Sequence, residues 1–370
     1  KYGVTLKNNT PKAMFKELFI ELSQINRVVL LIDEYDKPIN DYMHDLEKAN
    51  RNRQYLASFY EVIKSMDAYL QFVLLTGVTK FNKVSIFSKL NNLLDITLSE
   101  RFAGMLGITE EELYANFDEY LNITKDKLGY TENELKNEIR NLYNGYSWND
   151  EIRVYNPFSI LSFFIEKKFD NYWFETGTPT FLIDLIKRNH YDLTDLENTI
   201  VDSYAFGGFD YEKIDLNVLM FQAGYLTIKD ITVKRRGRRV YRLGIPNNEV
   251  KDSLANYILN AFSGQGITMV KPPYIRMLDE LETENIEAFI RLLQSAFAAL
   301  PYTLYPKRED YYHSIFYLML ALLGAQIDVE VLTDKGRIDG VVEFDDTIYV
   351  IEFKTGKAET GMRQIKERRY

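Results

Sequence analysis

Two short hydrophobic runs near the start of the chain predict a pair of neighbouring strands. The first run, VVLLI at Val28–Ile32, ends abruptly in the acids Asp33, Glu34 and Asp36. The second run, LQFVLL at residues 70–75, follows a segment whose apolar residues recur at helical spacing. A strand, a helix and a strand in this order predict a βαβ unit whose parallel sheet is buried on both faces. The acids then lie where open α/β sheets bind ligands, although a solvated acidic turn explains the same pattern.

The middle of the chain is predicted to be mainly helical. Thr109 and Thr131 each precede an acidic first turn and a helical pattern of apolar residues, so both are predicted N-caps. Residues 154–189 continue as helices, with breaks predicted at Pro157 and at the TGTP turn.

The next segment has the element order of a winged-helix module. It predicts a helix, a hairpin that turns at Gly237 and a further helix after Pro246. The tip of this hairpin, KRRGRR at residues 234–239, could be a wing that contacts phosphates. Charged hairpin tips are also common as plain solvated turns.

The C-terminal segment, GRIDGVVEFDDTIYVIEFK, carries the strongest chemical pattern. It follows two predicted helices, at residues 285–300 and 309–323, and contains two of three predicted strands. A hairpin that turns near Asp345 and Asp346 brings Asp339 close to Glu352. Since side chains two positions apart share a strand face, Glu352 and Lys354 are predicted to project together.

These residues suit a divalent metal. Two carboxylates and a backbone carbonyl are ligands for Mg²⁺, and a lysine beside the metal can activate a water molecule and stabilise charge on a phosphate. Glu309 and His313 stand at i and i+4 on one helical face and could extend the site. Gln364 lies on the closing helix. An ordinary amphipathic hairpin with charged edges explains the strand pattern equally simply.

The segment resembles the PD-(D/E)XK nuclease superfamily, whose core has a helix with an acid, a strand with an aspartate, a strand that ends in E-x-K, and a helix. The motifs GRID and IEFK, with EDYYH before them and RQIKERRY after them, look more specifically like the nuclease domain fused to AAA-ATPase-like proteins of bacteria. The resemblance implies metal ligands and further catalytic residues at these positions: Asp339, Glu352 and Glu309 for the metal, with Lys354 and Gln364.

The opening run resembles the same family. VVLLIDEYDKPIN looks like the Walker B strand of its ATPase-like domain, and FVLLTGVTKF looks like its sensor strand. The resemblance implies that Asp33 holds the Mg²⁺ of ATP, that Glu34 positions the attacking water and that Thr76 or Thr79 senses the γ-phosphate. A G-x-x-x-x-G-K-[ST] loop should precede this strand and none does. We therefore expect a fragment of a longer protein, or a lineage that lost the loop, with ATP a cofactor of the full-length protein.

The expected architecture is α/β with four parts. These are a partial P-loop ATPase-like parallel sheet (1–108), a helical lid (109–200), a winged-helix-like module (201–275) and a restriction-endonuclease-like α/β domain (276–370).

Composition limits the kinds of metal site and of binding partner that the chain can have. The chain has no cysteine, which excludes thiolate metal sites. It has only three histidines among 370 residues, so a multi-histidine metal site is not expected and a hard ion such as Mg²⁺ or Mn²⁺ is. No apolar run approaches the roughly 20 residues that span a bilayer, and a cytoplasmic protein is expected. The net charge of −9 weighs against binding of nucleic acid over the whole surface, but not in a local groove.

The leading interpretation is a metal-dependent nuclease acting on DNA and joined to an ATPase-like regulatory module. The competing interpretation is an ATP-dependent switch, or a scaffold, whose nuclease fold only binds nucleic acid or a partner. Assembly into a homo-oligomer stays open.

Overall fold

The protein is described by a computed structural model that divides the chain into two compact units. The first unit comprises Lys1–Met105, Ser147–Ile152 and Ile200–Leu243, and the second comprises Leu106–Tyr146, Arg153–Thr199 and Gly244–Tyr370. The structure describes residues 3–42, 45–78, 86–87, 90, 92–173, 199–207, 215–254, 277, 279–281, 283–298, 316, 320, 326–333, 336–344, 347–352, 362–363 and 365–367.

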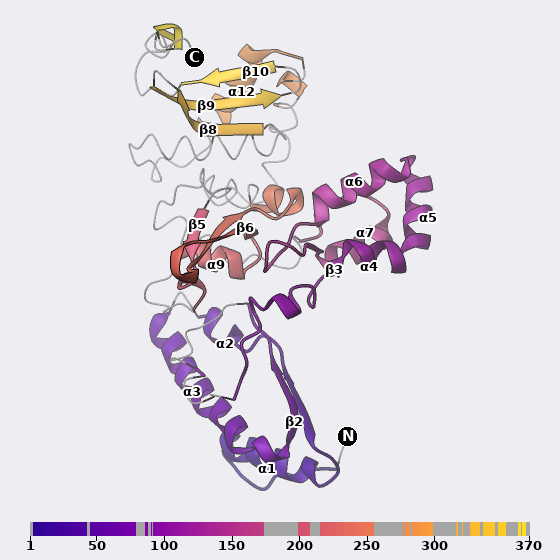
Figure 1. The fold of residues 1–370 in the computed structure, drawn as a ribbon, viewed down its shortest axis with the longest axis vertical. Coiled ribbons are helices and arrows are strands. Elements are labelled where there is room, and N and C mark those ends of the chain that lie inside the picture. Colours follow the sequence, from indigo (N-terminus) through magenta and orange to yellow (C-terminus); the bar gives the residue numbers. More distant parts are fainter. Residues whose placement is uncertain are drawn as a thin grey trace. The chain divides into compact units, whose positions relative to one another are not determined.

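The first unit begins with the predicted pair of strands and their helices (Figure 1). The two strands pair in parallel, which confirms the prediction. Thr10 caps the first helix by accepting a hydrogen bond from the Ala13 amide, and Asp45 caps the long helix by accepting one from Lys48. The elements are α1 (Pro11–Ser23), β1 (Val28–Ile32), α2 (Lys37–Asn40), α3 (Leu46–Ser65), η1 (Asp67–Tyr69), β2 (Leu70–Leu75) and η2 (Glu100–Phe102).

One face of this sheet stays in contact with solvent, so the prediction that it is buried on both faces is wrong. Helices α1 and α3 lie on one side of the strands, where Phe15 stacks on Phe59. On the other face Val29 is 55% exposed, Leu31 65% and Phe72 53%. An apolar run therefore shows only that a strand can be buried on both faces. Whether both faces are covered depends on elements from other parts of the chain, which the run itself does not reveal.

A three-stranded sheet completes the first unit. Its strand order is β5-β7-β6, and β6 and β7 form the predicted hairpin. The inserted segment Ser147–Ile152 is tied to β6, since the Ser147 amide donates a hydrogen bond of 2.7 Å to Thr227 and the Ile231 amide donates one of 2.8 Å to Asp150. The elements are β5 (Thr199–Asp202), η5 (Ala205–Gly207), α9 (Leu216–Gln222), β6 (Thr227–Val233), η6 (Arg235–Gly237) and β7 (Arg239–Gly244).

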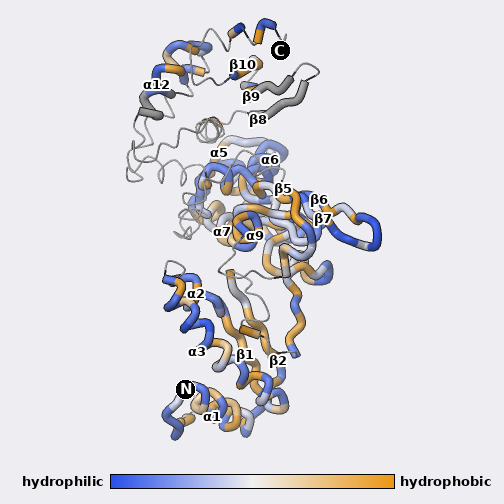
Figure 2. Tube along the Cα trace, turned by 90° about the vertical axis from the view of Figure 1, so that its left-hand side faces the viewer, coloured by the Kyte–Doolittle hydropathy of each residue, from blue (hydrophilic) through white to orange (hydrophobic). Residues whose placement is uncertain are grey.

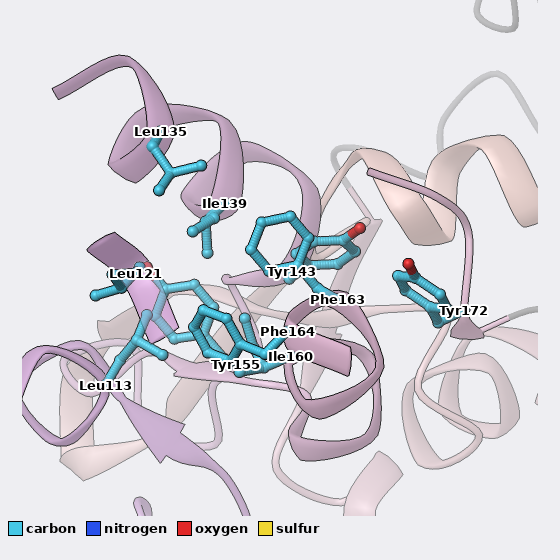
Figure 3. Packing of buried hydrophobic residues seen from close by; sticks show 10 residues of the cluster. All are labelled: Leu113, Leu121, Leu135, Ile139, Tyr143, Tyr155, Ile160, Phe163, Phe164 and Tyr172. Atoms are coloured by element: carbon cyan, nitrogen blue, oxygen red, sulfur yellow. The ribbon is translucent and has the colours of Figure 1, made fainter. Parts of the chain in front are cut away.

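Helices dominate the start of the second unit and share one core (Figure 3). Capping boxes at Thr109 and Thr131 confirm both predicted N-caps. Pro157 opens a helix instead of breaking one, because Asn156 caps it and proline is tolerated at the first helical position. The elements are β3 (Ile108–Thr109), α4 (Glu110–Asn116), α5 (Asp118–Leu128), α6 (Glu132–Tyr143), β4 (Val154–Tyr155) and α7 (Pro157–Glu166). The buried core side chains are Leu113, Leu121, Leu135, Ile139, Tyr143, Tyr155, Ile160, Phe163, Phe164 and Tyr172.

The C-terminal part of the second unit contains α12 (Ile286–Ala298), β8 (Gln326–Thr333), β9 (Gly336–Phe344) and β10 (Thr347–Ile351). The three strands form an antiparallel sheet of order β10-β9-β8, separate from the sheet of β1 and β2, as predicted. Residues 248–254, 362–363 and 365–367 are also helical. No helix in the described parts of the chain is long and apolar enough to span a membrane.

Candidate functional site

The register of β9 and β10 brings the two predicted carboxylates to facing positions. Phe344 pairs with Thr347, and the ladder runs from there to the pair of Gly340 and Ile351. The next step along the same register sets Glu352 directly opposite Asp339. Directly opposite residues of an antiparallel pair share a sheet face and have Cβ atoms roughly 4.5–5.5 Å apart. The hairpin therefore juxtaposes the two acids that the sequence singled out.

The two acids lie on the more accessible face of this sheet. Side chains alternate between faces, so Val342 belongs to the face opposite Asp339, and it is only 2% exposed. Glu343 and Ile348 belong to the face of the acids, and there Glu343 is exposed and Ile348 is 63% exposed. Asp339 and Glu352 themselves are partly exposed, so a ligand can reach them from solvent.

The neighbouring strand adds an acid that the sequence reasoning missed. On β8, Val329 pairs with Gly340 and Val331 pairs with Ile338, which leaves Glu330 at the position opposite Asp339. Acids thus occupy the same row on β8, β9 and after β10. A hairpin of β8 and β9 that pairs Thr333 with Gly336 gives this position directly. From the sequence a hairpin is predicted only for the next two strands, so Glu330 is not singled out.

The other residues predicted for this site lie outside the part of the chain that the structure describes. These are Glu309, His313, Lys354 and Gln364. Within the described residues, no group of three or more His, Cys, Asp or Glu side chains is arranged to hold a metal ion.

The described donors fit a small hard cation. Mg²⁺ is commonly bound through one or two protein carboxylates and keeps several of its waters, which Asp339 and Glu352 at facing positions satisfy. Thiolate chemistry has no donor in a chain without cysteine.

A second cluster stands at the carboxyl ends of β1 and β2. The hydroxyl of Thr76 donates a hydrogen bond of 2.5 Å to Oδ1 of Asp33, and the Glu34 amide donates one of 2.9 Å to the same oxygen. Glu34 has a left-handed backbone, with φ of 49°, and its carboxylate lies 3.8 Å from the Lys37 ammonium. The structure thus brings together the three residues predicted for the ATPase-like site. Thr79, the alternative to Thr76, lies outside the described residues.

Asp36, for which the sequence suggested no role, is fully buried beneath this cluster. Its Oδ1 accepts a hydrogen bond of 3.1 Å from the Val78 amide, and its Oδ2 accepts one of 2.7 Å from the Asn40 side chain. Gly77 makes this approach possible, because a Cβ there would lie 2.4 Å from Oδ1 of Asp36. Asp36 also contributes, after burial of the phenol, to raising the pKa of Tyr60. The acid therefore fastens the segment after β2 to the turn after β1.

Comparison with known proteins finds two family matches and a relative that matches over the whole of this chain. Residues 1–87 match the family model described as predicted AAA-ATPase, and residues 307–370 match the PD-(D/E)XK nuclease superfamily. The chain is 37% identical to a protein of Azotobacter chroococcum mcd 1 named "Uncharacterized protein in vnfD 5'region", over 100% of this chain and 71% of that relative. No solved structure matches the chain.

Proposed function

Because the chain belongs to the family of predicted AAA-ATPase-like proteins that carry a PD-(D/E)XK nuclease superfamily domain, we propose that it is a Mg²⁺- or Mn²⁺-dependent nuclease that hydrolyses phosphodiester bonds of DNA. The observation that carries the proposal is the facing register of Asp339 and Glu352 on the accessible side of the sheet. Two adjoining carboxylates without a cation would repel each other, so an accessible pair is well suited to sharing one.

Each residue of the proposed site has a separate role in hydrolysis. Asp339 and Glu352 would hold the metal, and Glu309 is proposed as a further ligand. When bound, the metal supplies a Lewis acid and lowers the pKa of water. Lys354 would orient or deprotonate the water that attacks phosphorus, and it would stabilise the charge that builds on the phosphate as the bond to the leaving oxygen breaks. Gln364 is proposed to position these groups from the closing helix.

The rest of the chain is proposed to regulate that site. We assign 1–108 to an ATPase-like core, 109–200 to a helical lid, 201–275 to a winged-helix-like module and 276–370 to the nuclease domain. The order of α9, the β6–β7 hairpin and the helix at 248–254 supports the winged-helix-like assignment. The hydrogen bonds that join Asp33, Glu34 and Thr76 support a metal–nucleotide role for the edge of the first sheet.

The test compares Asp339→Asn and Glu352→Gln with the matched control Glu343→Gln, which lies on the same face of β9. Labelled single-stranded and duplex DNA are incubated with each protein and Mg²⁺ or Mn²⁺. We expect both site variants to lose cleavage by on the order of 100-fold or more and to lose the rise in melting temperature that Mn²⁺ gives the parent chain. Cleavage that is unaffected by both variants would refute the proposal. DNA binding without any cleavage would favour the competing switch or scaffold.

A further inference from the structure

The β6–β7 hairpin concentrates positive charge in a chain that is acidic as a whole. Six of the 45 lysines and arginines lie between residues 234 and 242, and no Asp or Glu occurs from residue 231 to residue 248. The net charge of the whole chain is −9. This hairpin is therefore a local positive feature on a chain that otherwise repels polyanions.

The turn holds these residues outside the sheet. The Lys234 amide donates a hydrogen bond of 2.7 Å to the Arg238 carbonyl, which closes the loop. Arg236 and Gly237 inside it have left-handed backbones, with φ of 63° and 71°. Every residue from 232 to 239 is exposed. Figure 2 shows the joining loop as a continuous hydrophilic arm that extends away from its own strands.

Two of the arginines are already paired, and the pairs lie at the base of the loop. Arg238 donates to the carboxylate of Asp202 on β5 at 2.7 Å, and Arg239 donates to Glu100 at 3.2 Å. The Arg238 guanidinium lowers the pKa of Asp202, and Glu100 raises the pKa of Arg239. These pairs are surface contacts and hold the base of the loop only weakly.

Of the four other basic residues, Arg242 lies on β7 and three lie at the tip. Lys234, Arg235 and Arg236 take part in no ion pair with the described residues. Three adjacent cations on an exposed loop repel one another, and an anion with closely spaced charges relieves that repulsion. Arginine also binds phosphate oxygens through two parallel hydrogen bonds. A turn that only contacts water has no need of such a donor pair.

We propose that the tip formed by Lys234, Arg235 and Arg236 binds the phosphate backbone of nucleic acid, as a contact separate from the Asp339–Glu352 site. The inference rests on the proposed function in that the nuclease supplies the reason for a nucleic-acid contact. Backbone contacts of this kind position a protein on its substrate and carry no sequence information. The tip therefore adds affinity without sequence preference.

The test measures binding of a fluorescent duplex DNA of about 30 base pairs in EDTA, where metal-dependent cleavage is absent, across a range of salt concentrations. The tip variant carries Lys234→Ala, Arg235→Ala and Arg236→Ala. The matched control carries Lys16→Ala, Arg51→Ala and Lys64→Ala, which remove the same charge from exposed positions on α1 and α3 of the same unit. We expect the tip variant to bind at least about 10-fold more weakly and to lose about three units of salt slope, whereas the control binds as the parent chain does.

Each outcome of this binding test either supports or overturns the proposal that the tip binds the phosphate backbone. Equal losses in the tip variant and the control, or none in the tip variant, overturn the proposal. A tip variant that changes only self-association, measured by sedimentation, assigns the tip to the acidic surface of a second copy and also overturns it. Single-stranded DNA and duplex RNA of equal length show which backbone the tip prefers. DNA binding that depends on the tip, without any metal-dependent cleavage, supports this inference and refutes the proposed nuclease function. Metal-dependent cleavage by a tip variant that binds DNA as the parent chain does refutes this inference and leaves the nuclease function supported.

Discussion

Thr76 is hydrogen-bonded to Asp33 across the ends of two parallel strands, with 2.5 Å between the hydroxyl and Oδ1. The backbone reinforces this contact, since the Thr76 amide donates to the Ile32 carbonyl at 2.8 Å and the Tyr35 amide donates to the Thr76 carbonyl at 3.0 Å. Asp33 is thereby held at the sheet edge where α/β proteins bind ligands. The geometry supports a metal-binding carboxylate.

The first prediction concerns ATP turnover. The sequence contains no G-x-x-x-x-G-K-[ST] loop, whose backbone amides and lysine surround the β- and γ-phosphates. We expect this chain of 370 residues to release phosphate from Mg²⁺·ATP at the background rate, and Asp33→Asn to leave that rate unchanged. Turnover that Asp33→Asn abolishes would show that phosphates are held by residues other than such a loop.

The second prediction concerns Gly77. Its added Cβ would lie 2.4 Å from Oδ1 of Asp36 and 2.7 Å from the Tyr35 ring, and the Asp36 carboxylate is fixed by two hydrogen bonds. Gly77→Ala should therefore lower the unfolding free energy by about 1–3 kcal/mol, the usual cost of overpacking. Hydrogen exchange should accelerate at the amides of Tyr35 and Val78.

The control for this substitution is Gly340→Ala. Among the described residues, the added Cβ there meets the Cβ of Ile351 at the ordinary contact distance of 3.9 Å and nothing closer. Equal destabilisation by the two substitutions would show that loss of glycine, and not crowding against Asp36, is responsible.

The third prediction concerns Glu330. Its register position opposite Asp339 makes it a candidate supporting residue beside the proposed metal site. We expect Glu330→Gln to weaken Mn²⁺ binding by about 10-fold in calorimetry, the lower end of what supporting residues contribute at metal sites. Glu343→Gln is the control, since it removes the same charge from β9 about 13 Å along the strand from Asp339. A loss of affinity no greater than that of the control would exclude Glu330 from the site.

The strands that carry the first candidate site could be predicted closely from the sequence. β1 and β2 begin and end at the predicted residues, because each is an apolar run of the length of one strand. The facing of Asp339 and Glu352 also followed from the sequence, because a short turn fixes the register of a hairpin.

The roles that depend on distant contacts could not be predicted. Asp36 looked like one more acid of a solvated turn, and its burial depends on an amide 42 residues away and on the space left by Gly77. Pro157 was misread because its effect depends on Asn156, whose side chain accepts hydrogen bonds from the next turn. Local sequence patterns predict where helices and strands form. Whether a polar side chain is buried depends on hydrogen-bond partners that are distant in the sequence.

A buried carboxylate in the second unit leads to the fourth prediction. Glu249 is 1% exposed. Its Oε1 accepts hydrogen bonds from the Tyr172 and Trp173 amides, at 2.8 and 2.9 Å, and its Oε2 accepts one of 2.8 Å from the Ser159 hydroxyl. Burial raises the pKa of Glu249 to about 7, and these hydrogen bonds offset only part of that rise. Glu249 thus joins α7 and the chain at 172–173 to the helix at 248–254.

The fourth prediction is that the second unit is less stable at pH 8 than at pH 5. Because the pKa of Glu249 is raised from 4.5 to about 7, the folded chain holds this proton more tightly than the unfolded chain. Its stabilisation is full below about pH 4.5 and is lost as the pH rises through 7, a change of at most about 3 kcal/mol. Glu249→Gln keeps an acceptor for the two amides, so urea unfolding of this variant should depend less on pH than that of the parent chain. Burial also raises the pKa of Asp252, to about 6, so Asp252 should account for the pH dependence that remains in this variant. An unaltered pH dependence in Glu249→Gln would show that Glu249 is ionised in both states across this range.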